Sequence, residues 1–204
     1  MQETISLFAL FKLGGAVMWP LLLLLVAATA IIIDRIVFLI KTDRKPMRGA
    51  ETACEILRTQ GTGPAAAFCT EPRRIWGTAM AIALDRNGGK TSSIALAKAQ
   101  TEETLQGMER PLTYLDLIAS ISPILGFLGT VTGMIAAFKA ISEANTVQLQ
   151  VVAAGLYEAL FTTAFGLIIA VISTIAAHVF RQYVDTYALE MEHALALVES
   201  SELA

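Results

Sequence analysis

Charged residues are scarce in this chain, at 16% of 204 residues, against about 25% in a typical soluble domain. The net charge is -3 and the basic residues form no run, so nothing indicates a nucleic-acid partner. The two cysteines, Cys54 and Cys69, and the two histidines have spacings that fit no metal motif. No constellation suited to covalent catalysis is visible. We therefore expect neither an enzyme nor a bound cofactor.

Apolar sequence, in contrast, is abundant, because 55% of the residues are hydrophobic. A membrane helix needs about 20 mostly apolar residues, and residues 16–33, 117–138 and 159–177 qualify. The first stretch resumes after Asp34-Arg35, where a local ion pair is expected at the end of the span. These stretches predict an all-α membrane protein with three transmembrane helices.

The first stretch also has features of a secretory signal peptide, because Ala28-Thr29-Ala30 resembles a cleavage site. Three isoleucines follow that site directly, and Glu3 with the single Lys12 makes a poor basic leader. These features favour a retained span over a cleaved one.

Basic residues predict the orientation of the spans. Of 15 Lys and Arg residues, 11 lie between Lys41 and Arg110, and this bias places that segment in the cytoplasm. The N-terminus is then periplasmic and the C-terminus cytoplasmic. The predicted segments are a periplasmic 1–15, a first span 16–40, a cytoplasmic helical domain 41–116, a second span 117–138, a periplasmic loop 139–150, a third span 151–179 and a cytoplasmic helix 180–204.

The cytoplasmic segments read as helical extensions of the spans. We expect helices over 45–59 and 72–85, a stop at Gly88-Gly89, and a third helix capped by Thr91 or Ser92 that continues into the second span with a bend at Pro111. The third helix and the tail carry near-heptad stripes: Ile94, Ala97, Thr101, Leu105, Met108, Leu112 and Leu115, then Val184, Tyr187, Met191, Ala194 or Leu195, and Val198. We expect these stripes to pack within the chain and also to contact other copies.

Helical wheels sort the three spans by face. The second and third spans each gather small and weakly polar residues on one side, whereas the first shows no such stripe and is predicted to face lipid. The small faces are Ala119, Ser122, Gly126, Gly129, Thr130, Gly133 and Ala137, then Gly155, Glu158, Ala159, Thr162, Thr163, Gly166, Ala170, Ser173, Thr174 and Ala177.

Two interpretations of these small faces stay open at this point. Small residues in membrane helices usually serve helix packing, and a threonine hydroxyl can bond to its own helix, so Thr130 and Thr163 alone decide nothing. Glu158 is a carboxylate that directly precedes the third apolar stretch and follows the apolar run 151–157. An ionisable group there indicates function, with a solvated or helix-capping position at the periplasmic interface as the alternative.

Two motifs in these spans resemble a known family. Residues 122–134 read SPILGFLGTVTGM and residues 155–167 read GLYEALFTTAFGL. They are similar to the second-span and third-span signatures of the MotA/TolQ/ExbB proton-channel family, in its ExbB/TolQ branch. Trp19-Pro20 with the IIDR sequence at 32–35 resembles the family's first span. The flagellar MotA branch is unlike this chain because it has a fourth span.

The resemblance implies a five-fold homo-oligomeric ring around the single-span helices of an ExbD/TolR-like partner, with protons as the coupling ion. It implies that Thr130, Thr163, Glu158 and Thr162 guide protons beside a partner carboxylate. It also implies that small-face residues line the pore or pack on the partner helix, and these are Ser122, Gly126, Gly129, Gly133, Gly166, Ala170 and Ser173. One departure is that 168–173, IIAVIS, lacks the proline that many relatives carry there.

Several functions agree with these features. TonB-dependent uptake, with a TonB/TolA-like protein as a further partner, is the first expectation, and Tol-type envelope integrity and gliding-type motility use similar subunits. A self-contained channel or transporter is disfavoured because repeats and interrupted helices are lacking. A structural scaffold without ion flux predicts that Thr130, Thr163 and Glu158 tolerate substitution.

Overall fold

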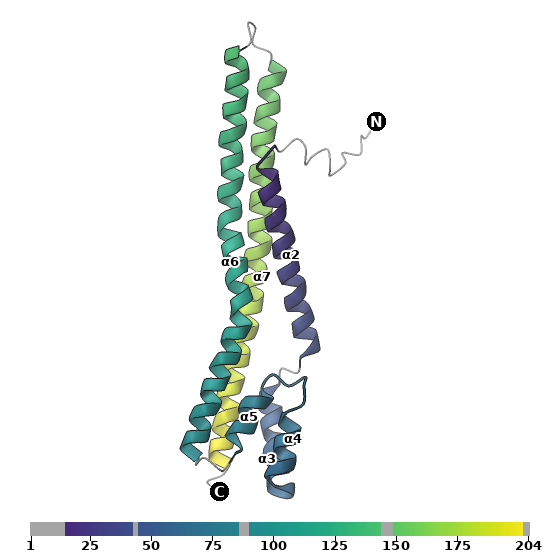
Figure 1. Ribbon diagram of the computed structural model, residues 1–204, viewed down its shortest axis with the longest axis vertical. Coiled ribbons are helices and arrows are strands. Elements are labelled where there is room, and N and C mark those ends of the chain that lie inside the picture. The colour runs from purple at the N-terminus through teal and green to yellow at the C-terminus, as the bar shows by residue number, and fades with distance from the viewer. Residues whose placement is uncertain (1–14, 43–44, 86–89, 144–148, 202–204) are drawn as a thin grey trace. The chain divides into compact units, whose positions relative to one another are not determined.

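The fold was analysed on a computed structural model that describes residues 15–42, 45–85, 90–143 and 149–201. The secondary structure of these residues is helical (Figure 1). The helices are α2 (Met18–Lys41), α3 (Pro46–Gln60), α4 (Thr62–Cys69), α5 (Gly77–Ala83), α6 (Lys90–Glu143) and α7 (Leu149–Ser201).

Three helices of the described ranges are long and apolar enough to cross a membrane: α2, α6 and α7. Helices α6 and α7 each join a predicted span to a predicted cytoplasmic extension, with 54 and 53 residues respectively. Helix α6 passes through Pro111 without interruption. The all-helical fold with three long apolar helices is therefore as expected, while the assignment of each segment to a side of the membrane stays a prediction.

The region between the first two spans differs in detail from the expectation. The helix expected from Pro72 begins only at Gly77, and α4 was not predicted. Turns precede α5, with Arg74 N–H donating to Glu71 O at 3.0 Å and Gly77 N–H to Arg74 O at 3.1 Å. A Cβ on Gly77 would overlap the Cys69 carbonyl, so tertiary packing of α4 on this turn sets the start of α5. The predicted stop at Gly88-Gly89 lies outside the described residues.

Contacts divide the chain into two units, each with its own core. Unit 1 comprises residues 1–33 and 113–177, and unit 2 comprises 34–112 and 178–204. In unit 1, the buried residues include Leu21, Ala28, Ala159 and Ile169. In unit 2 the largest buried side chain is Trp76, at 1% exposure.

The near-heptad stripes of α6 and α7 supply much of the buried surface. Each predicted stripe residue is buried except Leu105, which is half-buried. The polar exception, Thr101, is buried and donates its hydroxyl to Ala97 O at 2.9 Å, which satisfies the side chain inside its own helix. The prediction that these faces pack within the chain is therefore confirmed, and their contact with other copies stays a prediction.

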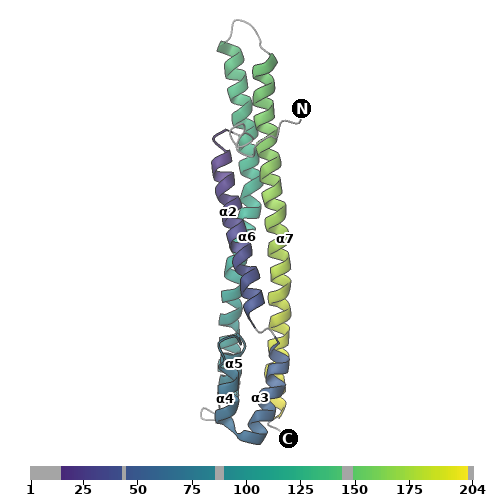
Figure 2. The same cartoon turned by 90° about the vertical axis from the view of Figure 1, so that its right-hand side faces the viewer.

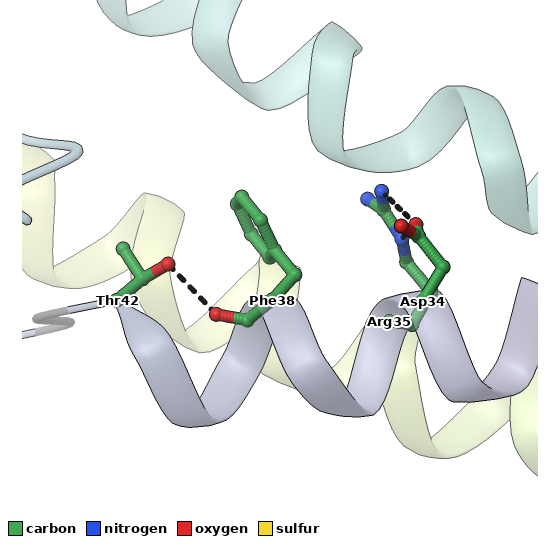
Figure 3. Close-up of polar contacts among 4 residues, drawn as sticks. All are labelled: Asp34, Arg35, Phe38 and Thr42. Atoms are coloured by element: carbon green, nitrogen blue, oxygen red, sulfur yellow. Dashed lines mark hydrogen bonds and ion pairs between the residues drawn. The ribbon is translucent and has the colours of Figure 1, made fainter.

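The end of α2 carries the predicted local ion pair, shown in Figure 3. Arg35 donates to the Asp34 carboxylate at 2.6 Å, and its guanidinium carbon lies 5.0 Å from the Phe38 ring centroid. Thr42 donates its hydroxyl to Phe38 O at 2.7 Å in the last turn. These contacts confirm the ion pair and give the charge at this end of α2 a partner on its own helix.

Helices α3, α4 and α5 form a small core around Trp76 in unit 2. Gly49 of α3 meets the indole directly, since a Cβ there would overlap the ring. Arg74 lies over the Phe68 ring at 3.8 Å and pairs with Glu71 at 3.0 Å. Cys69 is fully buried beside this cluster, and burial raises the pKa of its thiol to about 11, against a smaller lowering by Arg74.

We predict that Cys69 resists alkylation in the native protein. The thiolate is the nucleophile, so at about pH 8 a pKa near 11 lowers the reactive fraction on the order of 100-fold against an ordinary thiol. In a Cys54→Ala variant, maleimide labelling should be slow when native, fast when denatured, and faster as the pH approaches 11. Equal labelling of native and denatured protein at about pH 8 would contradict the burial of this thiol.

Candidate functional site

The small faces predicted for the second and third spans meet each other along one seam in unit 1. Figures 1 and 2 both show α6 and α7 side by side over this stretch. We call it the α6–α7 seam and define it by the buried residues of the two small faces, which are Ser122, Gly126, Gly129, Gly133 and Ala137 of α6, and Ala159, Thr162, Gly166, Ala170, Ser173 and Ala177 of α7.

Glycines let the two backbones approach closely along the seam. A Cβ on Gly126 would lie 3.0 Å from both Thr162 O and Thr163 Cα, and one on Gly166 would lie 2.5 Å from Ser122 O. At Gly129 an added Cβ would overlap the Thr162 side chain. Small residues at a helix interface give close van der Waals contact, which lipid-embedded helices need because lipid tails are as apolar as their side chains.

Two threonine hydroxyls of α7 reach the same carbonyl oxygen of α6. Thr163 donates to Gly126 O at 3.0 Å across the seam. Thr162 donates to Ala159 O at 2.9 Å in its own helix, and its Oγ1 lies 3.5 Å from Gly126 O. The carbonyl of a glycine in α6 is therefore held between adjacent threonines, and this polar contact lies in an otherwise apolar stretch.

The third predicted threonine behaves differently. Thr130 is half-buried and donates to Phe127 O in its own helix at 2.7 Å. Thr130 and Thr163 therefore do not bond to each other. For Thr130 the alternative interpretation holds, in which a membrane threonine bonds to its own helix.

Further along the seam, the two serines differ in how their hydroxyls are satisfied. Ser122 donates to Ile118 O at 2.6 Å, whereas the Ser173 hydroxyl is fully buried and has no hydrogen-bond partner in the described part of the chain. A buried hydroxyl without a partner costs about 1–3 kcal/mol, so Ser173 is the least satisfied polar group of the seam.

Glu158 lies one helical turn before Thr162 and is half-buried. Its carboxylate is next to Gly15, at the turn that precedes α2, and Gly15 has a φ of +64°. Glu158 was predicted as a site residue from the sequence, whereas Gly15 was not. Only its position before the first span could have drawn attention to it, because a single glycine in a turn carries no information about a distant carboxylate.

The outward faces of α6 and α7 in unit 1 are apolar and uncovered in the single chain. The most exposed of these side chains are Ile124, Phe127, Ile135 and Phe138 of α6 and Leu160, Ile168, Val171 and Ile175 of α7. Lipid or other protein must cover so large an apolar surface in a membrane protein.

Comparison with known proteins identifies the class of this protein. Residues 72–193, more than half of the chain and including the whole seam, match the MotA/TolQ/ExbB proton channel family. The chain belongs to this family, and within it the chain is ExbB/TolQ-like. It is therefore a multi-pass membrane protein of a family of proton-channel subunits that transduce energy.

Three relatives illustrate the likeness. An ExbB-like protein of Synechocystis sp., ExbB-like 3, is 30% identical over 183 residues, which cover 88% of this chain and 87% of the relative. Biopolymer transport protein ExbB of Salmonella typhimurium is 39% identical over 39% of this chain and 33% of its own length. Tol-Pal system protein TolQ of Haemophilus influenzae is 42% identical over 35% of this chain and 32% of its own length.

We predict that Gly129→Ala separates α6 from α7. The added methyl overlaps Thr162, and such overpacking costs about 1–3 kcal/mol, which should lower the melting temperature of the detergent-solubilised protein. Gly107→Ala, in the same helix, is the matched control because nothing lies within 4 Å of its Cβ. That control should be neutral or stabilising by up to about 1 kcal/mol. Equal melting temperatures for both variants would refute the close contact.

Proposed function

We propose that five copies of this chain form a ring in the bacterial inner membrane, around the single-span helices of an ExbD/TolR-like partner. The ring and its partner convert proton-motive force into mechanical work on an outer-membrane system. Membership of a proton-channel family supports this proposal, as do the large uncovered apolar faces of α6 and α7. Protons are the coupling ion, and no other cofactor takes part.

The observation that carries the proposal is the threonine contact in the seam. Thr163 and Thr162 place hydroxyls at the Gly126 carbonyl, and Glu158 lies one turn away on the same helix. An ionisable group at an apolar span indicates a proton or ion path, and hydroxyl groups next to it can form hydrogen bonds along such a path. We assign Thr130, Thr162, Thr163 and Glu158 to that path, with the partner's carboxylate as the group that takes up the proton.

The remaining small residues of the seam have a packing role inside one chain. Gly126, Gly129 and Gly166 contact α7 or α6 of the same chain. That these glycines, with Gly133, Ala170 and Ser173, line the pore or pack on the partner helix stays a prediction, because all of them are buried within the single chain. A buried water molecule would satisfy the Ser173 hydroxyl, which has no partner among the described residues.

The energy of proton transfer is adequate for such work. One charge that crosses 100 mV releases about 2.3 kcal/mol, so a few protons in each step can shift a partner helix past a modest barrier. In the proposed orientation the N-terminus lies in the periplasm and the C-terminus in the cytoplasm. The bias of 11 among 15 basic residues toward the segment 41–110 supports this orientation.

We propose uptake of the TonB-dependent kind as the process that is driven, with a TonB/TolA-like protein as a further partner. A relative that aligns over 88% of this chain is ExbB-like, although ExbB and TolQ themselves align over similar shares of the chain, 39% and 35%. An envelope-integrity role of the Tol kind is the competing assignment. Deletion of the protein should impair iron-siderophore uptake if the first assignment is right, and should raise detergent sensitivity if the second is right.

The first test is the native mass of the complex extracted in mild detergent after co-expression with its single-span neighbour. We expect five copies of this chain with one or two copies of the partner. A monomer or a small oligomer that ignores the partner would overturn the ring and favour a scaffold or a self-contained channel.

The second test substitutes Thr163, which donates its hydroxyl across the seam. Thr163→Ala removes the hydroxyl that reaches Gly126 O, and we expect energy-dependent uptake to be lost while the native mass is unchanged. Glu158→Ala should behave in the same way. Thr186→Ala on α7 is the matched control, because the Thr186 hydroxyl is exposed and bonds to its own helix at Gln182 O. Full uptake in Thr163→Ala and in Glu158→Ala would refute the proton-path assignment.

A further inference from the structure

The turn before α2 is shaped to accept the Glu158 carboxylate. Gly15 has a φ of +64°, in the left-handed region that favours glycine. A Cβ at this position would overlap Oε1 of Glu158 and lie 2.9 Å from its Cδ. Residue 15 therefore needs to be glycine for two independent reasons, its own dihedral angle and the presence of the carboxylate.

Gly15 is fixed to the first turn of α2. Its carbonyl accepts a hydrogen bond from Met18 N–H at 3.3 Å, and Trp19 N–H donates to Ala16 O at 3.4 Å. Met18 and Leu21 are buried, at 2% and 0% exposure, although half of the residues of α2 are exposed. The amino end is therefore the best-packed part of the first span, and Gly15 cannot move without it.

The electrostatics of this end of α2 favour an anion. The amino end of a helix carries a partial positive charge, which a carboxylate in or beside the first turn stabilises. The first turn of α2 contains no acidic residue of its own. Glu158, from α7, brings a carboxylate to this place.

The same stretch of α7 also contacts α6. Gly155 approaches Ala137 and Gly133 of α6, with an added Cβ 2.6 Å from Ala137 Cβ, and Thr163 donates to Gly126 O. Glu158 lies between these two contacts in the sequence of α7. Within unit 1, residues 155–163 of α7 are therefore in contact with α6 on one side and with the start of α2 at Glu158.

We propose that Glu158 is a positioning residue that anchors the amino end of α2 to α7. The anchor holds the start of the first span beside the part of α7 that carries Thr162 and Thr163. Gly15 leaves room for the Glu158 carboxylate. This inference deepens the proposed function, on which its consequence for proton transfer rests, whereas the anchor itself is measurable without any transport assay.

A double-mutant cycle on thermal stability tests the anchor in the purified, detergent-solubilised complex. Gly15→Ala brings backbone strain and the overlap with the carboxylate, while Glu158→Ala removes the carboxylate only. The strain is common to both backgrounds and cancels in the cycle. We expect Gly15→Ala to lower the melting temperature by about 3 °C or more in the wild-type background and by clearly less in Glu158→Ala.

Gly61→Ala is the matched control for this cycle. Gly61 also has a positive φ, +91°, but nothing lies within 4 Å of its Cβ. Its effect on the melting temperature should be the same with and without Glu158→Ala. Equal effects of Gly15→Ala in the two backgrounds would overturn the anchor.

Cross-linking gives a second readout in case Gly15→Ala prevents folding. In a background with Cys54→Ala and Cys69→Ala, Gly15→Cys with Glu158→Cys should form a reducible bond within one chain on mild oxidation. A disulfide needs Cβ atoms about 3.5–4.5 Å apart, so only close neighbours react. Gly15→Cys with Leu160→Cys in a Glu158→Ala background is the control, since it also lacks the carboxylate and Leu160 is 71% exposed on another face of α7. Reaction of the control pair alone, or bonds only between chains, would refute the contact.

Glu158→Gln separates the anchor from the proton path. Glutamine has the size of glutamate, so Gly15→Ala should cost as much stability in this background as in the wild type, and a smaller cost would count against the overlap. Uptake by Glu158→Gln reports on the other proposal: loss of uptake supports a proton-carrying carboxyl, and retained uptake leaves Glu158 as an anchor only.

Discussion

The close contact of two helix backbones is the constraint on which unit 1 depends. Gly126, Gly129 and Gly166 have no side chains, so α6 and α7 approach until carbonyl oxygens and threonine side chains of one helix touch the backbone of the other. In lipid no hydrophobic driving force holds helices together, and dispersion contact with a few polar bonds has to suffice. The same contact delivers the Thr163 hydroxyl to the Gly126 carbonyl. Packing and the candidate site are therefore one feature.

Unit 2 relies on a different source of stability. Its buried side chains are large, with Trp76, Met80 and Met191 among them, and its helices present ordinary amphipathic faces. Water drives such burial, as it does in any soluble domain. Along α6, the buried residues change from large apolar side chains such as Met108 to the buried glycines that begin at Gly126. This change agrees with water around one part of the helix and lipid around the other.

Much of this arrangement is readable in the sequence because it depends on periodicity and composition. Helices repeat every 3.6 residues, so the stripes from Ile94 and from Val184 could be assigned to buried faces, and uncharged stretches of about 20 residues identify spans. Thr162, Thr163 and Glu158 could be grouped for the same reason, because they lie on one half of one helix. The local ion pair of Asp34 and Arg35 follows from adjacency alone.

Contacts between distant segments could not be predicted from the sequence. Thr130 and Thr163 share the small faces, yet only the register of α6 against α7 decides that Thr163 reaches across the seam while Thr130 bonds to its own helix. The start of α5 depends on Gly77 meeting the Cys69 carbonyl, and the place of Glu158 depends on Gly15. The sequence by itself determined the three long apolar helices, their apolar faces and the family, since these follow from local pattern. Tertiary structure decided which polar groups meet, because that depends on the separation and register of helices far apart in the chain.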